Sequence, residues 1–378
     1  MKVAITFPGC HRRGGVERIV FECARFLAQQ KHEVHVYASE WEVDETQTIH
    51  YHEVPRVGGP AFLQGPSFFR NATAILKTAD YDVLNTHGSV CPAGGVHWAQ
   101  SIHKAWLERS RQFRPPLSSA RVKQALNPAH PLMLQLEAAH FKQRDYKQVI
   151  ATTPEVKEDL RRLYDVPGSD VAIIPNGFSP TEFNPEKRCA LRTRMREEIG
   201  LKPDEIALLF VANELERKGY ATILSALAQL KDPRLKVLAV GKPDPALIMQ
   251  EAEKRGVAGQ VIACGASQEV ASFHAAADVF VLPTQYEAFC LAILEALGSG
   301  LPVVTSTVPG ARDAILPGVN GALINDPKSG EQLAKALTPF LDRDYRDEMG
   351  AKVPETVTQY QWPSVLAKYE VLLLENQR

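Results

Sequence analysis

The chain has 378 residues, of which 23% are charged and 45% are hydrophobic, and its formal net charge is −1. This length exceeds that of a usual single domain, so we expect two domains, each able to bury its own core. The nearly balanced charge argues against a nucleic-acid-binding protein. The six cysteines are scattered without a Cys-x-x-Cys pair, so neither a zinc site nor a disulfide framework is indicated.

The N-terminus leads directly into a β run at residues 3–7, and apolar residues at helical spacing follow over residues 16–29. The loop between them contains Gly14 and Gly15. Its spacing does not match Gly-x-Gly-x-x-Gly, and it lacks the Lys and Ser/Thr of a phosphate loop, so NAD and ATP sites of these types are rejected. Paired glycines before a helix still allow an anionic ligand to approach the backbone, and a tight turn is the alternative.

A β strand at the start of the chain does not resemble a signal peptide, and no run of about 18 apolar residues is long enough to span a bilayer. We therefore expect a cytoplasmic protein that is not integral to the membrane.

Further β runs of the first half alternate with helical stretches and lie at residues 34–37, 49–54, 82–86, 149–152 and 171–174. Alternation of this kind predicts a parallel, doubly wound sheet, with ligands at the carboxyl ends of the strands. Asn85, Thr86 and His87 fall at such an end.

Residues 101–148 contain nine Lys or Arg against three acidic residues, and apolar side chains such as Trp106, Leu117 and Leu126 are interleaved with them. A basic, partly amphipathic segment suits an anionic membrane surface. A solvated helical face is the alternative.

Prolines at positions 175, 180 and 185 indicate a linker, after which a helix over residues 188–199 opens the second half. The α/β alternation then repeats, with β runs at residues 206–211, 236–240, 261–263, 279–282, 303–306 and 322–324.

The run at residues 279–282 leads through a loop with Glu287 into an apolar helix that carries Glu295. A helix that is apolar on all sides is expected to be buried, and its carboxylate then needs a partner. That partner is either a distant side chain or a ligand such as the hydroxyls of a ribose. Glu287 lies where the free N–H groups of the first helical turn attract phosphate.

Two glutamates separated by seven residues across a strand-to-helix junction are typical of one enzyme family. The chain resembles the retaining nucleotide-sugar glycosyltransferases of family 4. The other segments that carry this resemblance occur in the expected order and are Gly14-Gly15, Ile174-Pro175-Asn176-Gly177-Phe178, Arg217-Lys218-Gly219-Tyr220, Gly300-Leu301-Pro302-Val303-Val304 and Asn320-Gly321.

The resemblance implies the α/β GT-B fold, in which two Rossmann-like, doubly wound domains face a central cleft. Residues 1–175 would form the acceptor-side domain, 176–187 the linker, 188–357 the nucleotide-sugar-binding domain, and 358–378 a helix that crosses back to the first domain.

The resemblance also implies roles for individual residues. Arg217 and Lys218 would bind the leaving diphosphate, together with the amides of Phe289, Cys290 and Leu291 and the Gly14-Gly15 loop. Glu287 would contact the donor sugar, and Glu295 the ribose. Gly265 is a candidate for contact with the base. No His/carboxylate cluster at metal-ligand spacing is evident, so no metal and no other cofactor is expected.

Two departures from the family pattern concern the donor site. Ala212-Asn213 stands where many relatives have Gly-Arg, and Ala288 and Cys290 replace two glycines near the first glutamate. Many relatives also place a histidine at a strand end of the first domain. His97 and His103 are the candidates here, with His87 ranked below them.

We therefore expect a metal-independent hexosyltransferase that uses a UDP-sugar by default. Its acceptor would be a glycolipid or envelope saccharide, as in the lipopolysaccharide-core branch, and the enzyme would lie peripherally on the inner face of the cell membrane. A nucleotide-sugar hydrolase or epimerase of the same fold, and a catalytically silent binding protein, are the alternatives.

Overall fold

The computed structural model describes residues 1–114 and 118–378, and its contacts divide the chain into two compact units. The first unit comprises Met1–Asn176 and Pro363–Arg378, and the second unit is Gly177–Trp362. The second unit is thus inserted into the first. Residues 177–187, expected as a linker, belong to the second unit, and the return to the first unit begins a few residues beyond position 358.

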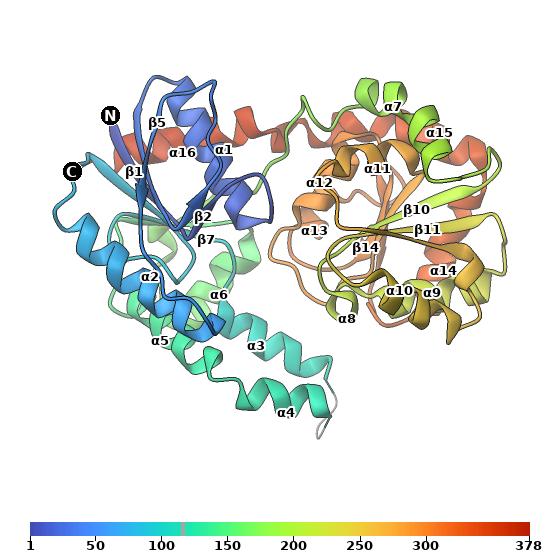
Figure 1. Ribbon diagram of the computed structural model, residues 1–378, viewed down its shortest axis with the longest axis horizontal. Helices are drawn as coiled ribbons and strands as arrows, with labels where there is room; N and C mark the ends of the chain where they lie inside the picture. Colours follow the sequence, from blue (N-terminus) through green and yellow to red (C-terminus); the bar gives the residue numbers. More distant parts are fainter. Residues whose placement is uncertain (115–117) are drawn as a thin grey trace. The chain divides into compact units, whose positions relative to one another are not determined.

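Within the described residues, the first unit is built on a seven-stranded parallel sheet of order β5-β3-β1-β6-β7-β8-β9, with helices on both faces (Figure 1). The core strand β1 has Val3, Ala4 and Ile5 fully buried, as expected for a strand covered on both sides. The strands are β1 (Lys2–Thr6), β3 (Glu33–Ala38), β5 (Ile49–Glu53), β6 (Val83–His87), β7 (Val96–Ala99), β8 (Gln148–Ala151) and β9 (Val171–Ile173), besides a short pair, β2 (Gly9–Cys10) and β4 (Glu40–Trp41).

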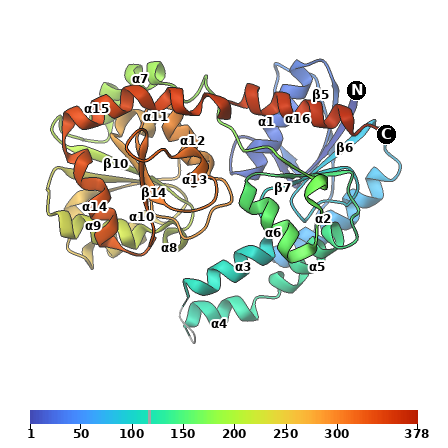
Figure 2. The same cartoon turned by 180° about the vertical axis from the view of Figure 1, so that it is seen from behind.

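The helices of the first unit are α1 (Val16–Gln29), α2 (Ala61–Leu76), α3 (His103–Gln112), α4 (Ser119–Leu126), α5 (Ala129–Phe141), α6 (Pro154–Tyr164), the 3₁₀ turn η1 (Gly168–Asp170) and α16 (Trp362–Glu375). Figure 2 shows α16 against the first unit. Tyr369 of this helix is fully buried, and its hydroxyl donates a 2.9 Å hydrogen bond to Asn85 Oδ1. The prediction that the last helix returns to the first domain is confirmed.

One internal strand of this sheet is not evident from the sequence. β7 lies between β6 and β8, but it has only four residues, includes His97, and directly follows Gly94-Gly95. Gly95 has φ +97°, and a Cβ there would lie 2.3 Å from the Leu84 carbonyl oxygen, so only glycine fits. As a result, His97 lies inside a strand rather than in a loop.

In the described part of the chain, the second unit has a six-stranded parallel sheet of order β12-β11-β10-β13-β14-β15. Leu209 of β10 and Phe280 of β13 are fully buried at its centre. The strands are β10 (Ile206–Val211), β11 (Leu235–Val240), β12 (Val261–Gly265), β13 (Val279–Leu282), β14 (Val303–Ser306) and β15 (Gly321–Ile324). The predicted pair of doubly wound domains is confirmed.

The helices of the second unit also lie on both faces of its sheet (Figure 1). They are α7 (Pro185–Glu198), α8 (Leu215–Lys218), α9 (Tyr220–Leu230), α10 (Pro245–Glu253), α11 (Val270–Ala276), α12 (Leu291–Gly298), α13 (Ala311–Ala314), α14 (Gly330–Leu337) and α15 (Arg343–Lys352), with 3₁₀ turns η2 (Ala258–Gln260), η3 (Thr338–Leu341) and η4 (Val353–Tyr360). Among the helices of the described residues, none combines the length and apolar character needed to cross a lipid bilayer.

The two ends of the second unit lie side by side. Phe178 N donates to Tyr360 O at 3.0 Å, and Trp362 N donates to Phe178 O at 2.9 Å. A Cβ on Gly177 would lie 2.6 Å from the Trp362 ring, so this glycine of the Ile-Pro-Asn-Gly-Phe segment permits the close approach.

Candidate functional site

A charged cluster lies at the carboxyl ends of β10 and β13 in the second unit. Arg217 and Lys218 end α8, which follows β10, and Glu287 lies in the loop between β13 and α12. Because β10 and β13 are adjacent and parallel, the segments that follow them meet at one edge of the sheet. Lys218 Nζ lies 2.5 Å and Arg217 Nη1 2.7 Å from Glu287 Oε1. The structure thus brings three of the predicted donor-site residues together.

A tight turn at Gly219 positions α8 in this cluster. Gly219 has φ +82°, and a Cβ there would lie 2.1 Å from the Pro283 carbonyl oxygen. The Gln285 N–H donates to the Arg217 carbonyl at 2.9 Å, which joins α8 to the loop that carries Glu287. The glycine of the Arg-Lys-Gly segment is therefore required by both its backbone conformation and its close contact.

The cluster is partly sealed from water, with the side chains of Lys218 and Glu287 each 13% exposed. Burial acts to raise the pKa of Glu287, but the charges of Lys218 and Arg217 outweigh it and hold this pKa below its ordinary value. Burial acts to lower the pKa of Lys218, but the negative charge of Glu287 outweighs it, so this pKa is raised overall. All three side chains are therefore charged at neutral pH.

The N-terminus of α12 adjoins this cluster. Cys290 is its N-cap residue, no side chain caps the helix, and Lys218 Nζ lies 3.9 Å from Cys290 Sγ. Burial raises the pKa of the Cys290 thiol, so it remains protonated. The N-terminal amides and the helix dipole make this end of α12 attractive to an anion. Phe289 precedes the cap, and its ring packs against Gly310.

Two further residues predicted for the donor site, besides Gly265, lie in the same unit. Leu291 is the first residue of α12, and Glu295, four residues further on, is 7% exposed, as predicted for a carboxylate within a buried helix. Gly265 ends β12, two strands away from β10, with φ +71° and its carbonyl accepting from Gly241 N at 2.8 Å.

The glycine loop belongs to the first unit. Gly14 has φ +96°, and a Cβ there would lie 2.4 Å from Glu17 Oε2. Gly15 is the N-cap residue of α1 and has open space around it. The loop thus exposes backbone at a helix N-terminus.

The three candidate histidines differ in burial. His97 is 2% exposed and its Nδ1 lies 2.8 Å from Thr86 Oγ1, while His87 is fully buried and its Nε2 lies 2.7 Å from Asn85 Oδ1. Burial lowers the pKa of both, to about 3 for His87. His103, at the start of α3, is partly exposed, and burial and His130 lower its pKa to about 4. Only His103 of the three keeps substantial contact with solvent.

Two buried polar residues of the first unit, Gln100 and His11, were not predicted as site residues from the sequence. Gln100 directly follows β7 and is 8% exposed, and its Nε2 has no hydrogen-bond partner among the residues described. His11 directly follows β2, is also 8% exposed, and has an unpartnered Nδ1 by the same criterion. Recognition of β7 would have placed Gln100 at the carboxyl end of a strand, where ligands are expected.

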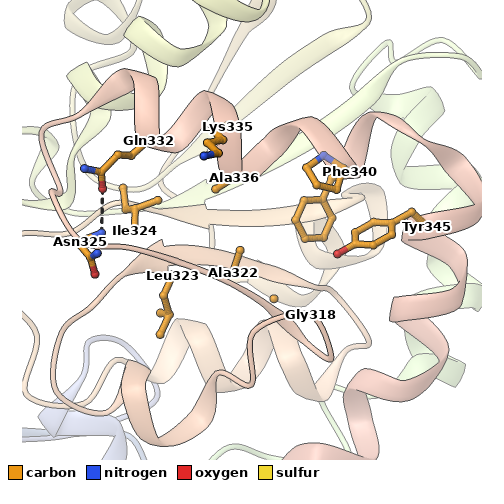
Figure 3. A pocket seen from close by; sticks show the side chains of 12 residues that line it. Gly318, Ala322, Leu323, Ile324, Asn325, Gln332, Lys335, Ala336, Phe340 and Tyr345 are labelled. Atoms are coloured by element: carbon orange, nitrogen blue, oxygen red, sulfur yellow. Dashed lines mark hydrogen bonds between the residues drawn. The ribbon is translucent and has the colours of Figure 1, made fainter.

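A separate pocket of about 360 Å³ lies between the edge strand β15 and α14 (Figure 3). Its lining is mostly apolar, with Lys335 as its charged residue, and includes none of the predicted site residues. The Asn325 N–H donates to Gln332 Oε1 at 3.0 Å at one end of it. The charged cluster, and not this pocket, is therefore the candidate site. No group of three or more His, Cys, Asp or Glu within residues 1–114 and 118–378 is arranged to hold a metal ion.

Comparisons with known proteins agree with this architecture. The model of Glycosyltransferase Family 4 matches residues 13–182, and that of Glycosyl transferases group 1 matches residues 192–356. The chain is 30% identical to the D-inositol 3-phosphate glycosyltransferase of Xylanimonas cellulosilytica, over 91% of this chain and 88% of that protein. It is 26% identical to the lipopolysaccharide glucosyltransferase WaaG of Escherichia coli, over 87% and 86% respectively.

Solved structures of glycosyltransferases share the fold of this chain. The crystal structure of WaaG, described as a glycosyltransferase involved in lipopolysaccharide biosynthesis, superposes with a TM-score of 0.84 at 25% identity, covering 98% of this chain and 99% of that one. Anabaena Alr3699/HepE in complex with UDP-glucose shares the fold, with a TM-score of 0.76 at 17% identity over 99% of this chain and 100% of that one. The chain belongs to the family 4 glycosyltransferases of GT-B fold. Its relatives include the lipopolysaccharide-core branch.

Proposed function

We propose that the protein is a retaining hexosyltransferase that moves a sugar from a nucleotide sugar, by default a UDP-sugar, to a glycolipid or saccharide acceptor of the cell envelope. The cluster of Arg217, Lys218 and Glu287 beside the N-terminus of α12 carries this proposal. The likeness to WaaG supports an acceptor in lipopolysaccharide synthesis, and the UDP-glucose complex of HepE supports the donor class.

The chemistry requires groups that stabilise a leaving diphosphate as its negative charge grows. Arg217, Lys218 and the amides of Phe289, Cys290 and Leu291 supply cations and N–H donors for this task. In the proposed mechanism these groups stabilise the diphosphate without a metal ion. In this proposal Glu295 binds the ribose and Gly265 contacts the base. The Gly14-Gly15 loop of the first unit lies near the donor phosphates and the acceptor.

Glu287 is ionised, so its role is to stabilise positive charge at the anomeric carbon rather than to donate a proton. The bond from the anomeric carbon to the phosphate oxygen breaks, and a bond to the acceptor oxygen forms on the same face of the sugar. The acceptor's proton passes to the departing phosphate. His103 is the first candidate for a histidine that contacts the acceptor. His97 ranks below it, because its side chain is buried.

The test is release of nucleoside diphosphate from UDP-, GDP-, ADP- and TDP-sugars, with an envelope glycan as acceptor and with or without EDTA. We expect acceptor-dependent turnover with one donor, unaffected by EDTA, and strong loss in Arg217→Gln. Arg343→Gln is the matched control, because Arg343 is 84% exposed and lies on α15. Turnover without acceptor would indicate a hydrolase or epimerase, and no turnover of any donor would indicate a catalytically silent protein.

We also propose that α3, α4 and α5 contact an anionic membrane surface. In both views, α3 and α4 extend away from the sheet of the first unit (Figures 1 and 2). On α4, Val122 is 47% and Leu126 76% exposed, next to the basic Arg121 and Lys123. Apolar side chains flanked by cations suit the interface of an anionic bilayer. Leu117, also part of the basic segment 101–148, lies outside the described residues.

A further inference from the structure

The guanidinium of Arg217 is almost fully occupied by protein acceptors. Its Nε and Nη2 each donate to one oxygen of Glu214 at 3.1 Å, and Nη1 donates to Tyr286 O at 2.8 Å and Glu287 Oε1 at 2.7 Å. A guanidinium has five N–H donors, and these bonds use four of them. Arg217 therefore has one N–H left for a ligand while Glu214 is in place.

The two carboxylates that face Arg217 are held very differently. Glu287 is 13% exposed, pairs with both Arg217 and Lys218, and also accepts from Thr284 Oγ1 at 3.2 Å. Glu214 is 60% exposed, and its carboxylate pairs with Arg217 alone among the side chains described. An exposed ion pair of this kind is easily replaced by water, whereas a buried one is not. Glu214 is thus the carboxylate that can leave.

The charges of the cluster lead to the same conclusion. Arg217 and Lys218 carry two positive charges, and Glu214 and Glu287 carry two negative ones, so the cluster is neutral as it stands. A diphosphate that bound to this neutral cluster would meet no net positive charge to attract it. Departure of Glu214 leaves the cluster with one net positive charge and frees two parallel N–H groups, the arrangement that binds a phosphate in a bidentate manner.

We propose that Glu214 competes with the donor diphosphate for Arg217 and thereby sets the affinity of the donor site. This inference rests on the proposed function, because it takes the diphosphate of a nucleotide sugar as the ligand of Arg217. Glu214 moves into water as the diphosphate binds and returns to Arg217 as the nucleotide leaves. The exchange weakens donor binding and favours release of the nucleoside diphosphate product.

The test is the Kd for UDP, measured by calorimetry on the full chain and its variants. Glu214→Gln should bind UDP about two- to fivefold more tightly, the range expected when an exposed competing ion pair is removed. Glu216→Gln is the matched control, since Glu216 is an exposed acid on the same helix α8 and makes no ion pair with Arg217. Arg217→Gln should weaken binding about tenfold or more, because a charge-assisted contact is lost.

The outcomes separate this inference from the proposed function. If the wild-type chain binds none of UDP, GDP, ADP and TDP, both are overturned. If UDP binds and Arg217→Gln weakens it, but Glu214→Gln behaves like Glu216→Gln, only the role of Glu214 is overturned. In the double variant Glu214→Gln/Arg217→Gln, the gain from Glu214→Gln should disappear. A gain that persists without Arg217 would show a general charge effect and would also overturn the proposal.

Discussion

At the scale of single residues, the donor cluster depends on Glu287 being charged. We expect Glu287→Gln to leave the 13% exposed Lys218 ammonium without its counterion, which costs about 3 kcal/mol of unfolding free energy. Turnover should fall about 100-fold or more, since a group that stabilises the transition state is lost. Urea unfolding and donor turnover measure the two effects, with Glu216→Gln as control. A variant of full stability and activity would contradict the assignment.

The contribution of Glu287 to the stability of the fold should decrease as the pH falls. Because the pKa of Glu287 is lower in the folded chain than in the unfolded one, its contribution to stability is fully present above the unfolded pKa. That contribution is lost as the pH falls through the folded pKa.

Gly219 offers a second prediction at this scale. In Gly219→Ala, the left-handed backbone and the Cβ placed 2.1 Å from the Pro283 carbonyl should together cost about 3 kcal/mol and displace Arg217 and Lys218. Gly200→Ala is the matched control, because Gly200 has φ +74° but no atom near its missing Cβ, so about 1 kcal/mol is expected. Denaturant unfolding and UDP binding are the measurements. Equal effects of the two substitutions would show that the contact with Pro283 is unimportant.

At the scale of elements, α16 is fastened to the first unit by a buried polar contact. Tyr369→Phe should cost about 1 kcal/mol of unfolding free energy, because Asn85 Oδ1 loses the tyrosine hydroxyl but keeps His87 Nε2 as a partner. Tyr345→Phe is the control, since the Tyr345 hydroxyl makes no hydrogen bond within the described residues. A loss for Tyr345→Phe as large as that for Tyr369→Phe would contradict this account.

A second prediction at this scale concerns the binding of α3 and α4 to a membrane surface. Replacing Val122 and Leu126 by Ser should reduce binding to vesicles that contain anionic lipid about tenfold, because two exposed apolar side chains no longer insert. Sedimentation with vesicles measures this, and binding should weaken as salt is added. Leu247→Ser is the control, since Leu247 is 46% exposed in the second unit. Unchanged binding of the double variant would favour a solvated face.

At the scale of the whole molecule, buried neutral histidines make the fold sensitive to acid. Burial lowers the pKa of His87 to about 3, and it lowers the pKa of His97 and His140 as well. Unfolded histidine has a pKa of about 6.5, so below this pH the unfolded chain binds more protons and stability falls. His87 alone should cost about 2 kcal/mol between pH 7 and pH 5.

Urea unfolding at pH 7 and pH 5 measures this loss of stability. The comparison should include His87→Gln, which cannot take up the proton. Its pH dependence should be smaller than that of the wild-type chain by the contribution of one histidine. An unchanged pH dependence would show that His87 titrates normally.

Most of the fold could be predicted because its strands are apolar runs that alternate with amphipathic helices. Strand β7 could not, since a four-residue run with a histidine is recognisable only beside β6 and β8. The donor cluster could be predicted as a set of residues from the family segments. Its ion pairs could not, because Arg217 and Glu287 lie seventy positions apart and meet only through the pairing of β10 and β13. Glu214 and Arg217, in contrast, are three positions apart, a spacing at which acidic and basic side chains meet on a helix, so this contact could be anticipated from the sequence.

The insertion of the second unit has a consequence for biosynthesis. Residues 177–362 are contiguous, so this unit can fold on the ribosome as soon as its last turn has emerged. The first unit begins earlier but is completed only when α16 has been translated. Until then, Asn85 and the neighbouring Trp98 lack the Tyr369 side chain that packs against them. The nascent chain therefore carries an unfinished N-terminal half throughout the synthesis of its other half, and this interval is when we expect it to depend on chaperones.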